Sequence, residues 1–386
     1  ALDQVGGIEM LTKLAESVPS AANVSYYAKL VKDRALRRRV IREASEIIAE
    51  AYKDQGNVED FVDQTEQKIL EVSNQKTNNS LVRVDSIVQD SIKLVEKLYD
   101  QKEIVTGVAS GFQDLDQMTA GFQPADLIII AARPSMGKTA LALSIGNYVS
   151  IEKRKSVAIF SLEMSKEQLV LRSLCSEARV DNSNVRTGHL GERDFSKLVD
   201  AASRIAEAKL FIDDTGSISI TELRAKCRRL HRQEPLSMVI VDYLQLMRSP
   251  FYAHSREQEI SDISRSLKAL AKELSVPVVA LSQLNRSVES RTDKRPVMSD
   301  LRESGAIEQD ADIIMFIYRD QVYNPETVDK NVAEIIISKQ RNGPTGTVRL
   351  HFDGSLTRFD NLEKHHDIPD LDLMQVPLIS EDSEAF

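Results

Sequence analysis

The chain has 386 residues, of which 42 % are hydrophobic and 28 % charged, and its formal net charge is −9. This length is enough for two or three domains with buried cores, and the composition excludes collagen-like, mucin-like and wholly disordered proteins. The longest unbroken apolar run covers residues 127–132. It is far shorter than the roughly 18 residues that span a bilayer, so we expect no membrane segment.

The opening residues and the cysteines favour a cytoplasmic protein. No basic segment followed by an apolar one opens the chain, so no export signal is expected. Cys175 and Cys227 are too few for a disulfide framework and are expected to be reduced thiols. The chain opens on Ala1 rather than Met, which suggests a piece of a longer protein. Its acidic charge argues against an overall basic surface but is compatible with a local nucleic-acid site.

Residues 1–75 are predicted to be helical. Apolar residues recur at helical spacing from Asn23 to Ala51 and again over 58–72, with Gly56-Asn57 between the two stripes. Two helices joined by such a short turn form a helical hairpin. A linker follows over 76–103, and within it residues 84–99 form an isolated amphipathic helix. Its apolar stripe must pack either on its own domain or on another subunit.

From residue 104 to residue 360 the pattern becomes that of an α/β fold with a mostly parallel sheet. Short β-branched runs alternate with helical segments, which predicts βαβ units. The expected strands cover 127–131, 157–162, 210–212, 238–241, 278–281, 313–317 and 335–337. The expected helices cover 138–149, 165–179, 194–208, 219–232 and 257–274. The last runs, 332–338, 346–352 and 356–359, have no helices between them, and residues 343–346 predict a hairpin turn.

Residues 361–386 are expected to form a flexible acidic tail. They hold seven acidic residues against Lys364, which gives a net charge of −6. The segment also holds two prolines and no helical period. A solubilising end without a partner and a docking peptide fit this composition about equally well.

Residues 132–139, Ala-Arg-Pro-Ser-Met-Gly-Lys-Thr, stand between an apolar strand and a helix, as a phosphate-binding P-loop requires. In such a loop the backbone N–H groups face an anion, Lys138 reaches the outer phosphates and the Thr139 hydroxyl ligates Mg²⁺. The usual first glycine is replaced by Ala132, which can serve if its φ is negative. The alternative is a chance Gly-Lys-Thr at a helix start. The expected nucleotide-binding residues are Ser135, Met136, Gly137, Lys138, Thr139 and Ala140.

Two strand ends carry carboxylates that suit a P-loop enzyme. Asp242 ends the apolar run Met-Val-Ile-Val, which is the Walker B pattern, and would hold Mg²⁺ through water. Glu163 follows the strand expected over 157–162 and could deprotonate an attacking water. As alternatives, Asp242 could cap a helix or turn, and Glu163 could interact with a helix dipole.

Three further segments give weaker signals. Gln283 at a strand end could sense a γ-phosphate, and Arg302 with Gly305 could present a cation and bare backbone to DNA. Lys339 and Arg341, two cations one residue apart, suit an arginine finger that completes a neighbour's site. A strand-end amide, a solvated helix start and a charged sheet edge are the ordinary alternatives for these three segments.

Six segments together resemble one family. They occur in the same order as in the bacterial replicative DNA helicases of the DnaB type, which have a RecA-like motor domain. The segments cover residues 132–139, 160–165, 241–246, 281–286, 300–305 and 338–343. The resemblance covers nearly the whole chain, and residues 5–7 and 22–24 are similar to the end of that family's N-terminal domain, whose preceding lobe is absent here.

The resemblance implies a ring of six copies that hydrolyses ATP at the subunit interfaces. Such a ring moves 5′→3′ on single-stranded DNA and unwinds the duplex at the replication fork. It implies ATP and Mg²⁺ as cofactors, and it implies single-stranded DNA, further copies of the chain, primase and a helicase loader as partners. The helix over 84–99 would be the linker helix that docks on the next subunit.

The same resemblance implies roles for residues of the ATP site. Glu163 is the base, Asp242 and Thr139 serve the metal, Gln283 senses the γ-phosphate, and Arg172 lies on the adenine.

It also implies roles outside that site. Lys339 and Arg341 act on the neighbour's nucleotide, whereas Arg302, Glu303 and Gly305 face the DNA backbone. One departure from the family lies at residues 254–258, in a loop expected to face DNA.

Two rival functions remain open at this point. A RecA-type recombinase or a clock-type ATPase would share the fold, since fold does not fix function. The helical hairpin and the docking helix favour the helicase over both. A non-catalytic loader or scaffold is the second rival, and the intact Lys138, Glu163, Asp242 and Arg341 argue against it.

Overall fold

The computed structural model describes most of the chain. The described residues are 24–53, 83–101, 105–248, 255–301 and 305–362, with Met10, Val58, Phe61, Thr65, Lys68 and Ile69. The chain divides into two compact units. One holds Ala1–Glu103 with Ser219–Cys227, and the other holds Ile104–Ile218 with Arg228–Phe386.

The first unit confirms the predicted helices where it is described. Helix α2 covers Val24–Ala51, and α4 covers Val84–Gln101. Val58 and Lys68 are also helical, and Lys68 Nζ donates to both carboxylate oxygens of Glu50 at 2.7 and 2.6 Å. This ion pair joins α2 to the second predicted arm of the hairpin. Residues 76–82 and 102–103 of the expected linker lie outside the described residues, as do residues 363–386 of the expected acidic tail.

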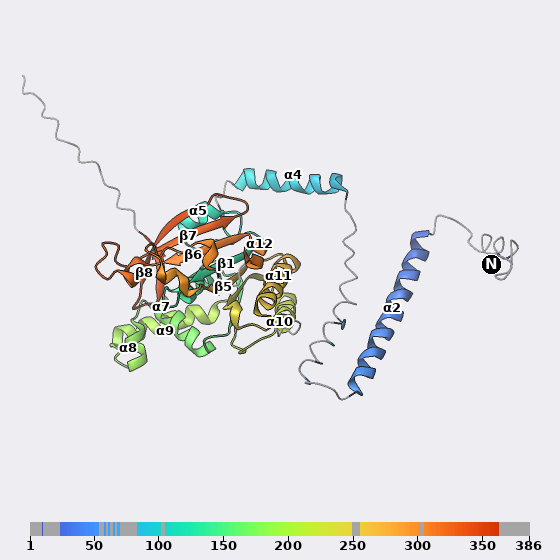
Figure 1. Cartoon of the computed structure of the whole chain (residues 1–386), viewed down its shortest axis with the longest axis horizontal. Coiled ribbons are helices and arrows are strands. Elements are labelled where there is room, and N and C mark those ends of the chain that lie inside the picture. The colour runs from blue at the N-terminus through green and yellow to red at the C-terminus, as the bar shows by residue number, and fades with distance from the viewer. Residues whose placement is uncertain are drawn as a thin grey trace, which may run out of the picture. The chain divides into compact units, whose positions relative to one another are not determined.

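The second unit is built on a sheet of nine strands within the described residues (Figure 1). Their spatial order is β3-β2-β4-β5-β1-β6-β7-β8-β9. Strands β1 to β6 pair in parallel, and β6 to β9 pair antiparallel. The strands are β1 Leu127–Ala132, β2 Ser156–Ser161, β3 Leu210–Asp213, β4 Leu236–Asp242, β5 Val278–Gln283, β6 Ile313–Tyr318, β7 Val332–Gln340, β8 Gly346–Asp353 and β9 Arg358–Asn361.

Helices precede the first strand and lie between successive strands as far as β7, which fits the predicted alternation. They are α5 Gln113–Thr119, α6 Lys138–Asn147, α7 Lys166–Ala178, α8 Asn182–Thr187, α9 Glu192–Glu207, α10 Ile220–Gln233, α11 Arg256–Leu274, α12 Gly305–Asp310 and α13 Asp320–Tyr323. The sequence did not reveal α5, α8, α12 or α13, because such short helices hardly show a helical period. The helix predicted over 138–149 ends as α-helix at Asn147 and continues as a π-helical turn over Tyr148–Glu152.

The core follows from the parallel strands. Every residue of β1, β2 and β6 is buried, because helices cover both faces of a parallel sheet. Strands β7 and β8 alternate between buried and less buried residues along much of their length, as antiparallel strands with one covered face do. No helix in the described parts of the chain is long and apolar enough to cross a membrane. Because β2, β4, β5 and β1 pair in parallel, their carboxyl ends lie along one edge of the sheet.

Candidate active site

A cavity of about 510 Å³ opens at this carboxyl edge. Ala132 at the end of β1 lies beside Gln283 at the end of β5, and Ser161 at the end of β2 lies beside Asp242. The cavity gathers residues that are far apart in the sequence. Those that line it are Ala132, Arg133, Pro134, Ser135, Gly137, Lys138, Thr139, Ala140, Glu163, Met164, Arg172, Gln283, Phe352 and Thr357.

The P-loop has the backbone that the motif requires. Ser135 and Gly137 adopt positive φ values of 68° and 99°, whereas Ala132 keeps a negative φ and serves in place of glycine. Gly137 immediately precedes α6. A Cβ at Gly137 would lie 3.1 Å from the rings of Phe352 and Phe359, so glycine also fits the close packing there. The strand, loop and helix of the predicted P-loop are confirmed.

The Walker residues meet behind the loop. Thr139 Oγ1 donates to Asp242 Oδ2 at 2.6 Å, and Asp242 is only 3 % exposed. The other carboxylate oxygen, Oδ1, is buried and accepts no hydrogen bond from the described residues. It lies 3.5 Å from Lys138 Nζ. A hydroxyl and a carboxylate with an unsatisfied buried oxygen are hard oxygen donors, so these residues fit Mg²⁺.

Lys138 lies in a partly desolvated position. Its side chain is 13 % exposed, and its Nζ lies 4.1 Å from the centre of the Tyr243 ring. Burial lowers the pKa of Lys138, and the carboxylates of Asp242 and Glu163 act in the opposite direction. Because phosphate groups would add further negative charge beside Nζ, a bound nucleotide would favour the charged ammonium.

Glu163 faces the cavity from outside any helix. Helix α7 begins at Lys166 after the N-cap Ser165, which accepts from the backbone N–H of Gln168 in a capping box. Glu163 precedes this cap and is exposed, so it does not serve as the first residue of a helix. The geometry leaves its carboxylate available to a solvent molecule in the cavity.

A residue that the sequence did not single out connects β4 to β5. Gln245 Nε2 donates to Ser282 Oγ at 2.8 Å, and Gln245 Oε1 accepts from the backbone N–H of Gln283 at 3.3 Å. The amide of Gln245 therefore ties the segment after Asp242 to the end of β5. Gln245 lies in segment 241–246, which carries the family resemblance, but that segment predicted no role for it.

The remaining wall of the cavity comes from the antiparallel strands and from helix α7. Phe352 in β8 and Thr357 before β9 line the cavity together with Arg172 of α7. The sequence predicted Arg172 only through the resemblance, and it did not predict Phe352 or Thr357.

Lys339 and Arg341 do not join this cavity. Strand β7 runs antiparallel to β6, and Lys339 pairs with Ile314 near the amino end of β6. The amino ends of β6 and β1 lie together, with Ile313 beside Ile128. The two cations therefore lie at the opposite edge of the sheet from the P-loop, with the length of β1, about 16 Å, in between.

At that edge the two cations hold the end of α12. Lys339 Nζ donates to the carbonyl of Ala311 at 2.7 Å and to that of Glu308. Arg341 Nη2 donates to the carbonyl of Gln309 at 2.8 Å, and its Nε lies 3.4 Å from Asp312 Oδ1.

The expected DNA-facing loop is described only at its end. Arg302 and Glu303 lie outside the described residues, as does His254 in the second expected DNA loop. Gly305 begins α12 and is exposed, and among the described residues no other heavy atom lies within 4 Å of the position a Cβ would take.

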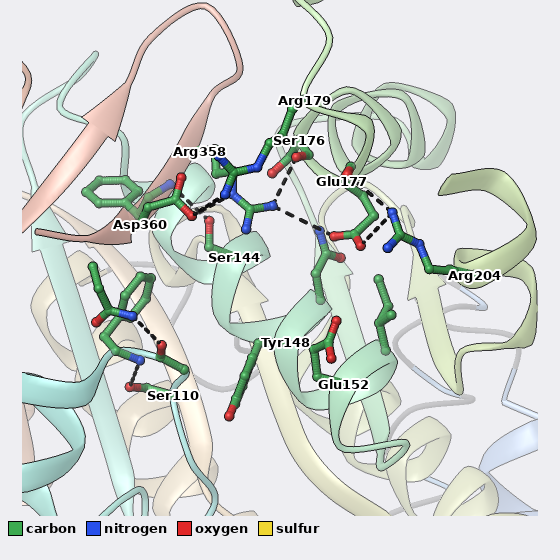
Figure 2. A pocket seen from close by; sticks show the side chains of 16 residues that line it. Ser110, Ser144, Tyr148, Glu152, Ser176, Glu177, Arg179, Arg204, Arg358 and Asp360 are labelled. Atoms are coloured by element: carbon green, nitrogen blue, oxygen red, sulfur yellow. Dashed lines mark hydrogen bonds and ion pairs between the residues drawn. The ribbon is translucent and has the colours of Figure 1, made fainter. Parts of the chain in front are cut away.

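A second cavity of about 440 Å³ lies beside the C-terminal ends of α6 and α7 (Figure 2). Figure 2 shows Arg358 between Asp360 and Glu177. Its Nε donates to Asp360 Oδ1 at 2.8 Å, and its Nη1 donates to the carbonyl of Ser176 at 3.0 Å. Arg204 pairs with Glu177 at 3.1 Å. These contacts fix the end of α7, the helix that carries Arg172, to β9.

Comparison with known proteins decides the family. The model of the DnaB-like helicase C terminal domain matches residues 107–361, and that of the DnaB-like helicase N terminal domain matches residues 1–33. The chain belongs to the DnaB-like replicative helicases. It is 50 % identical to the replicative DNA helicase DnaC of Bacillus subtilis and to the replicative DNA helicase DnaB of Geobacillus stearothermophilus. Each match covers 95 % of this chain and 81 % of the relative.

Solved structures agree with this DnaB-like assignment. A DnaB-like replicative helicase, solved in a study of its interactions with primase, is 37 % identical, with a TM-score of 0.77 over 94 % of this chain and 85 % of that one. A second solved structure, an isolated ATPase domain, is 42 % identical, with a TM-score of 0.69 over 72 % of this chain and 99 % of that one. The predicted RecA-like α/β fold and the predicted replicative helicase function are confirmed. The recombinase and scaffold alternatives are set aside.

Proposed function

We propose that this DnaB-like helicase hydrolyses ATP with Mg²⁺ in the cavity at the carboxyl edge of its sheet. The observation that carries the proposal is the contact of Thr139 with Asp242 beside Lys138, at a loop with P-loop geometry. The P-loop N–H groups and Lys138 would bind the phosphates. Thr139 and Asp242 would hold the Mg²⁺, which supplies charge neutralisation on the phosphate oxygens when bound.

The other residues of the cavity have complementary roles. Glu163 accepts the proton of the attacking water, because it is the exposed carboxylate on the cavity wall. The amide of Gln283 contacts the γ-phosphate from the end of β5, and Gln245 orients the backbone on which it lies. Arg172 and Phe352 offer a cation and a ring to the adenine.

We further propose that six copies form a head-to-tail ring. Lys339 and Arg341 lie about 16 Å of strand from their own P-loop, so they can reach only another subunit's nucleotide. When two different surfaces of the same chain meet at every interface, the copies form a closed ring if the rotation between neighbouring subunits closes. The exposed apolar residues Ile87, Ile92 and Val95 of α4 would dock on the next subunit of this ring.

Within the ring, Arg302, Glu303 and Gly305 would contact the backbone of single-stranded DNA, and the motor would move 5′→3′ along it. One contact supports a link between DNA binding and hydrolysis. Lys339 and Arg341 donate to carbonyls at the C-terminal end of α12, and this helix begins at Gly305. Movement of the DNA-facing end of α12 would therefore shift the residues that act on the neighbour's nucleotide.

The domain organisation and partners follow the same proposal. The helical hairpin over 1–75 and the linker over 76–103 would precede the motor over 104–360, with the acidic tail over 361–386. A relative whose solved structure concerns its interactions with primase supports primase as a partner. A loader is a further expected partner. Because the substrate of a replicative helicase is chromosomal DNA, we propose the cytoplasm as its location.

Native mass spectrometry with and without ATP·Mg²⁺, together with an ATPase assay with and without single-stranded DNA, tests these statements. Six copies with ATP and a rate that rises with DNA are expected. Lys138→Ala is the control, because it removes the charge that binds the phosphates and should abolish both rates. A monomer under all conditions would contradict the ring, and a rate unaffected by DNA would contradict the coupling.

A further inference from the structure

We propose that Arg319 is a positioning residue of the nucleotide site, which holds the P-loop from outside the cavity so that a P-loop N–H faces the phosphates. No sequence motif marks this residue. It directly follows β6, the strand next to β1, and so lies at the same carboxyl edge as the P-loop. The inference rests on the proposed nucleotide site.

Arg319 touches the loop directly. Its Nη1 donates to the carbonyl of Ser135 at 3.2 Å. Its guanidinium lies over the ring of Phe352, with Cζ 4.0 Å from the ring centre. Phe352 in turn lines the cavity and packs against Gly137. Two separate contacts therefore connect Arg319 to both ends of the segment from Ser135 to Gly137.

The carbonyl that Arg319 binds determines the direction of a donor. In a planar trans peptide the C=O of Ser135 and the N–H of Met136 point in opposite directions. A P-loop binds phosphate with such N–H groups, so its carbonyls point away from the anion. The Met136 N–H makes only a long bond, 3.3 Å, to the carbonyl of Arg133. A cation on the Ser135 carbonyl keeps this peptide oriented and polarises its N–H toward a phosphate.

The charge of Arg319 is not balanced by any of the residues that the structure describes. Within the described part of the chain the guanidinium has no carboxylate partner, and its Nε is buried without a hydrogen-bond acceptor. Burial lowers the pKa of Arg319, although a guanidinium stays charged. The neighbouring Asp320 is bound by the hydroxyl of Tyr318 at 2.7 Å. A partly desolvated cation without a counter-ion is costly, and the phosphates of a nucleotide would supply the missing negative charge.

A nearby arginine provides a matched control. Arg295 lies over the ring of Tyr318, with Cζ 4.8 Å from its centre, but its Nε donates to Glu334 at 2.8 Å. It has the same kind of ring contact as Arg319, yet it has a carboxylate partner and no described contact with the P-loop. Loss of a ring contact alone would affect both arginines, whereas loss of the P-loop contact affects only Arg319.

The test is the affinity of the full chain for ADP·Mg²⁺ and ATP·Mg²⁺, measured by calorimetry, for wild type, Arg319→Met, Arg319→Gln and Arg295→Met. Methionine keeps much of the apolar stem. We expect the Arg319→Met affinity to fall about 10- to 100-fold, the loss typical of a hydrogen bond from a charged group. The KM for ATP should rise by a similar factor with little change in kcat. Arg295→Met should bind within about 2-fold of wild type.

Thermal unfolding distinguishes the positioning role of Arg319 from a purely structural one, which would lower the melting temperature without nucleotide. Thermal unfolding without nucleotide should change little in Arg319→Met, whereas the rise in melting temperature on adding ADP should shrink. If Arg319→Met does not fold, Arg319→Gln is judged by the same criterion. Unchanged affinity in the folded Arg319 variant, or an equal loss in Arg295→Met, would overturn the inference. Failure of the wild type to bind either nucleotide would instead overturn the proposed nucleotide site.

Discussion

Asp242 contacts both side chains by which the P-loop would act on phosphate and metal. Its Oδ2 accepts from Thr139, and its Oδ1 lies near Lys138 without a hydrogen bond. A buried carboxylate is costly unless it is paired, and here one lysine and one hydroxyl compensate it only in part. A bound divalent cation would complete the compensation. Glu163 differs, because it is exposed and lines the cavity.

This difference between the two carboxylates predicts the effect of Glu163→Gln. ATP affinity should stay within about 3-fold of wild type, because the amide keeps the shape of the side chain, whereas kcat should fall by about 10²–10⁴-fold because the base is lost. Calorimetry and a steady-state ATPase assay measure the two quantities. Glu167→Gln, an exposed change in the first turn of the nearby α7, should leave both unchanged. A collapse of ATP affinity in Glu163→Gln would mean that Glu163 is structural.

At the scale of elements, strand β1 connects the P-loop to a cluster of charged side chains at its other end. Its carboxyl end leads into the P-loop, and the carboxylates of Asp126 and Asp312 lie at its amino end. Leu127 N donates to Asp312 Oδ2 at 2.8 Å, and Lys268 Nζ pairs with that carboxylate. Arg341 contacts the other oxygen of Asp312. The strand that presents the P-loop therefore begins in the network that holds the proposed finger.

Asp126 makes this network sensitive to pH. Burial and the neighbouring Asp312 raise the pKa of Asp126 to about 6, against the opposing charges of Lys268 and Arg341. Because its folded pKa lies above its unfolded value, near 3.9, this carboxyl binds its proton more tightly in the folded state. Its contribution to stability is therefore greatest below about pH 4 and is lost as the pH rises through about 6.

Asp126→Asn removes the ionisable carboxyl group and with it the loss of stability at higher pH. The melting temperature of the variant should exceed that of wild type at pH 7.5 by a few degrees, since about 1 kcal/mol shifts a domain of this size by roughly 2–4 °C. The difference should shrink as the pH is lowered to 4, which provides an internal control. Thermal unfolding followed by circular dichroism across this range measures it. A variant less stable than wild type at pH 7.5 would contradict the assignment.

At the scale of the whole molecule, the sheet separates the two halves of the proposed catalytic machinery. The P-loop and its carboxylates lie at one edge, and Lys339 with Arg341 lies at the other. About 16 Å of strand separates the two groups within one subunit. In the proposed ring the carboxyl edge of one copy would therefore meet the amino edge of the next.

Mixing two inactive variants tests this arrangement. Lys138→Ala and Arg341→Ala should each lack ATPase activity, since a charge supplied in trans contributes about 10³–10⁵ in rate. In a 1:1 mixture roughly one interface in four would have both halves intact, because interfaces join different subunits. Activity should therefore reappear, provided that one intact interface suffices. Mass-tagged subunits verify exchange, and Lys138→Ala mixed with itself is the control. Lower ATP affinity of Arg341→Ala in an isolated monomer would indicate a role within its own subunit.

Local sequence patterns were sufficient to predict which residues meet at the carboxyl edge of the sheet. The P-loop, Glu163, Asp242 and Gln283 each end or follow an apolar strand, and parallel strands place their ends together. Their meeting could therefore be inferred without coordinates, as could the helices α2 and α4, because apolar residues recur at helical spacing in both segments. The π-helical turn after α6 could not, because it continues the apolar pattern of the helix.

Other features became visible only once the chain was folded. Arg319 reaches the P-loop from the end of β6, which pairs in parallel with β1, and Phe352 and Thr357 reach the cavity through the antiparallel pairing of β6 to β9. The same pairing puts Lys339 and Arg341 at the opposite edge from the P-loop, which a strand-end motif does not reveal. The reason is physical: hydrophobic period and loop chemistry are local properties of a sequence, whereas strand order and register are set by which surfaces bury best against one another.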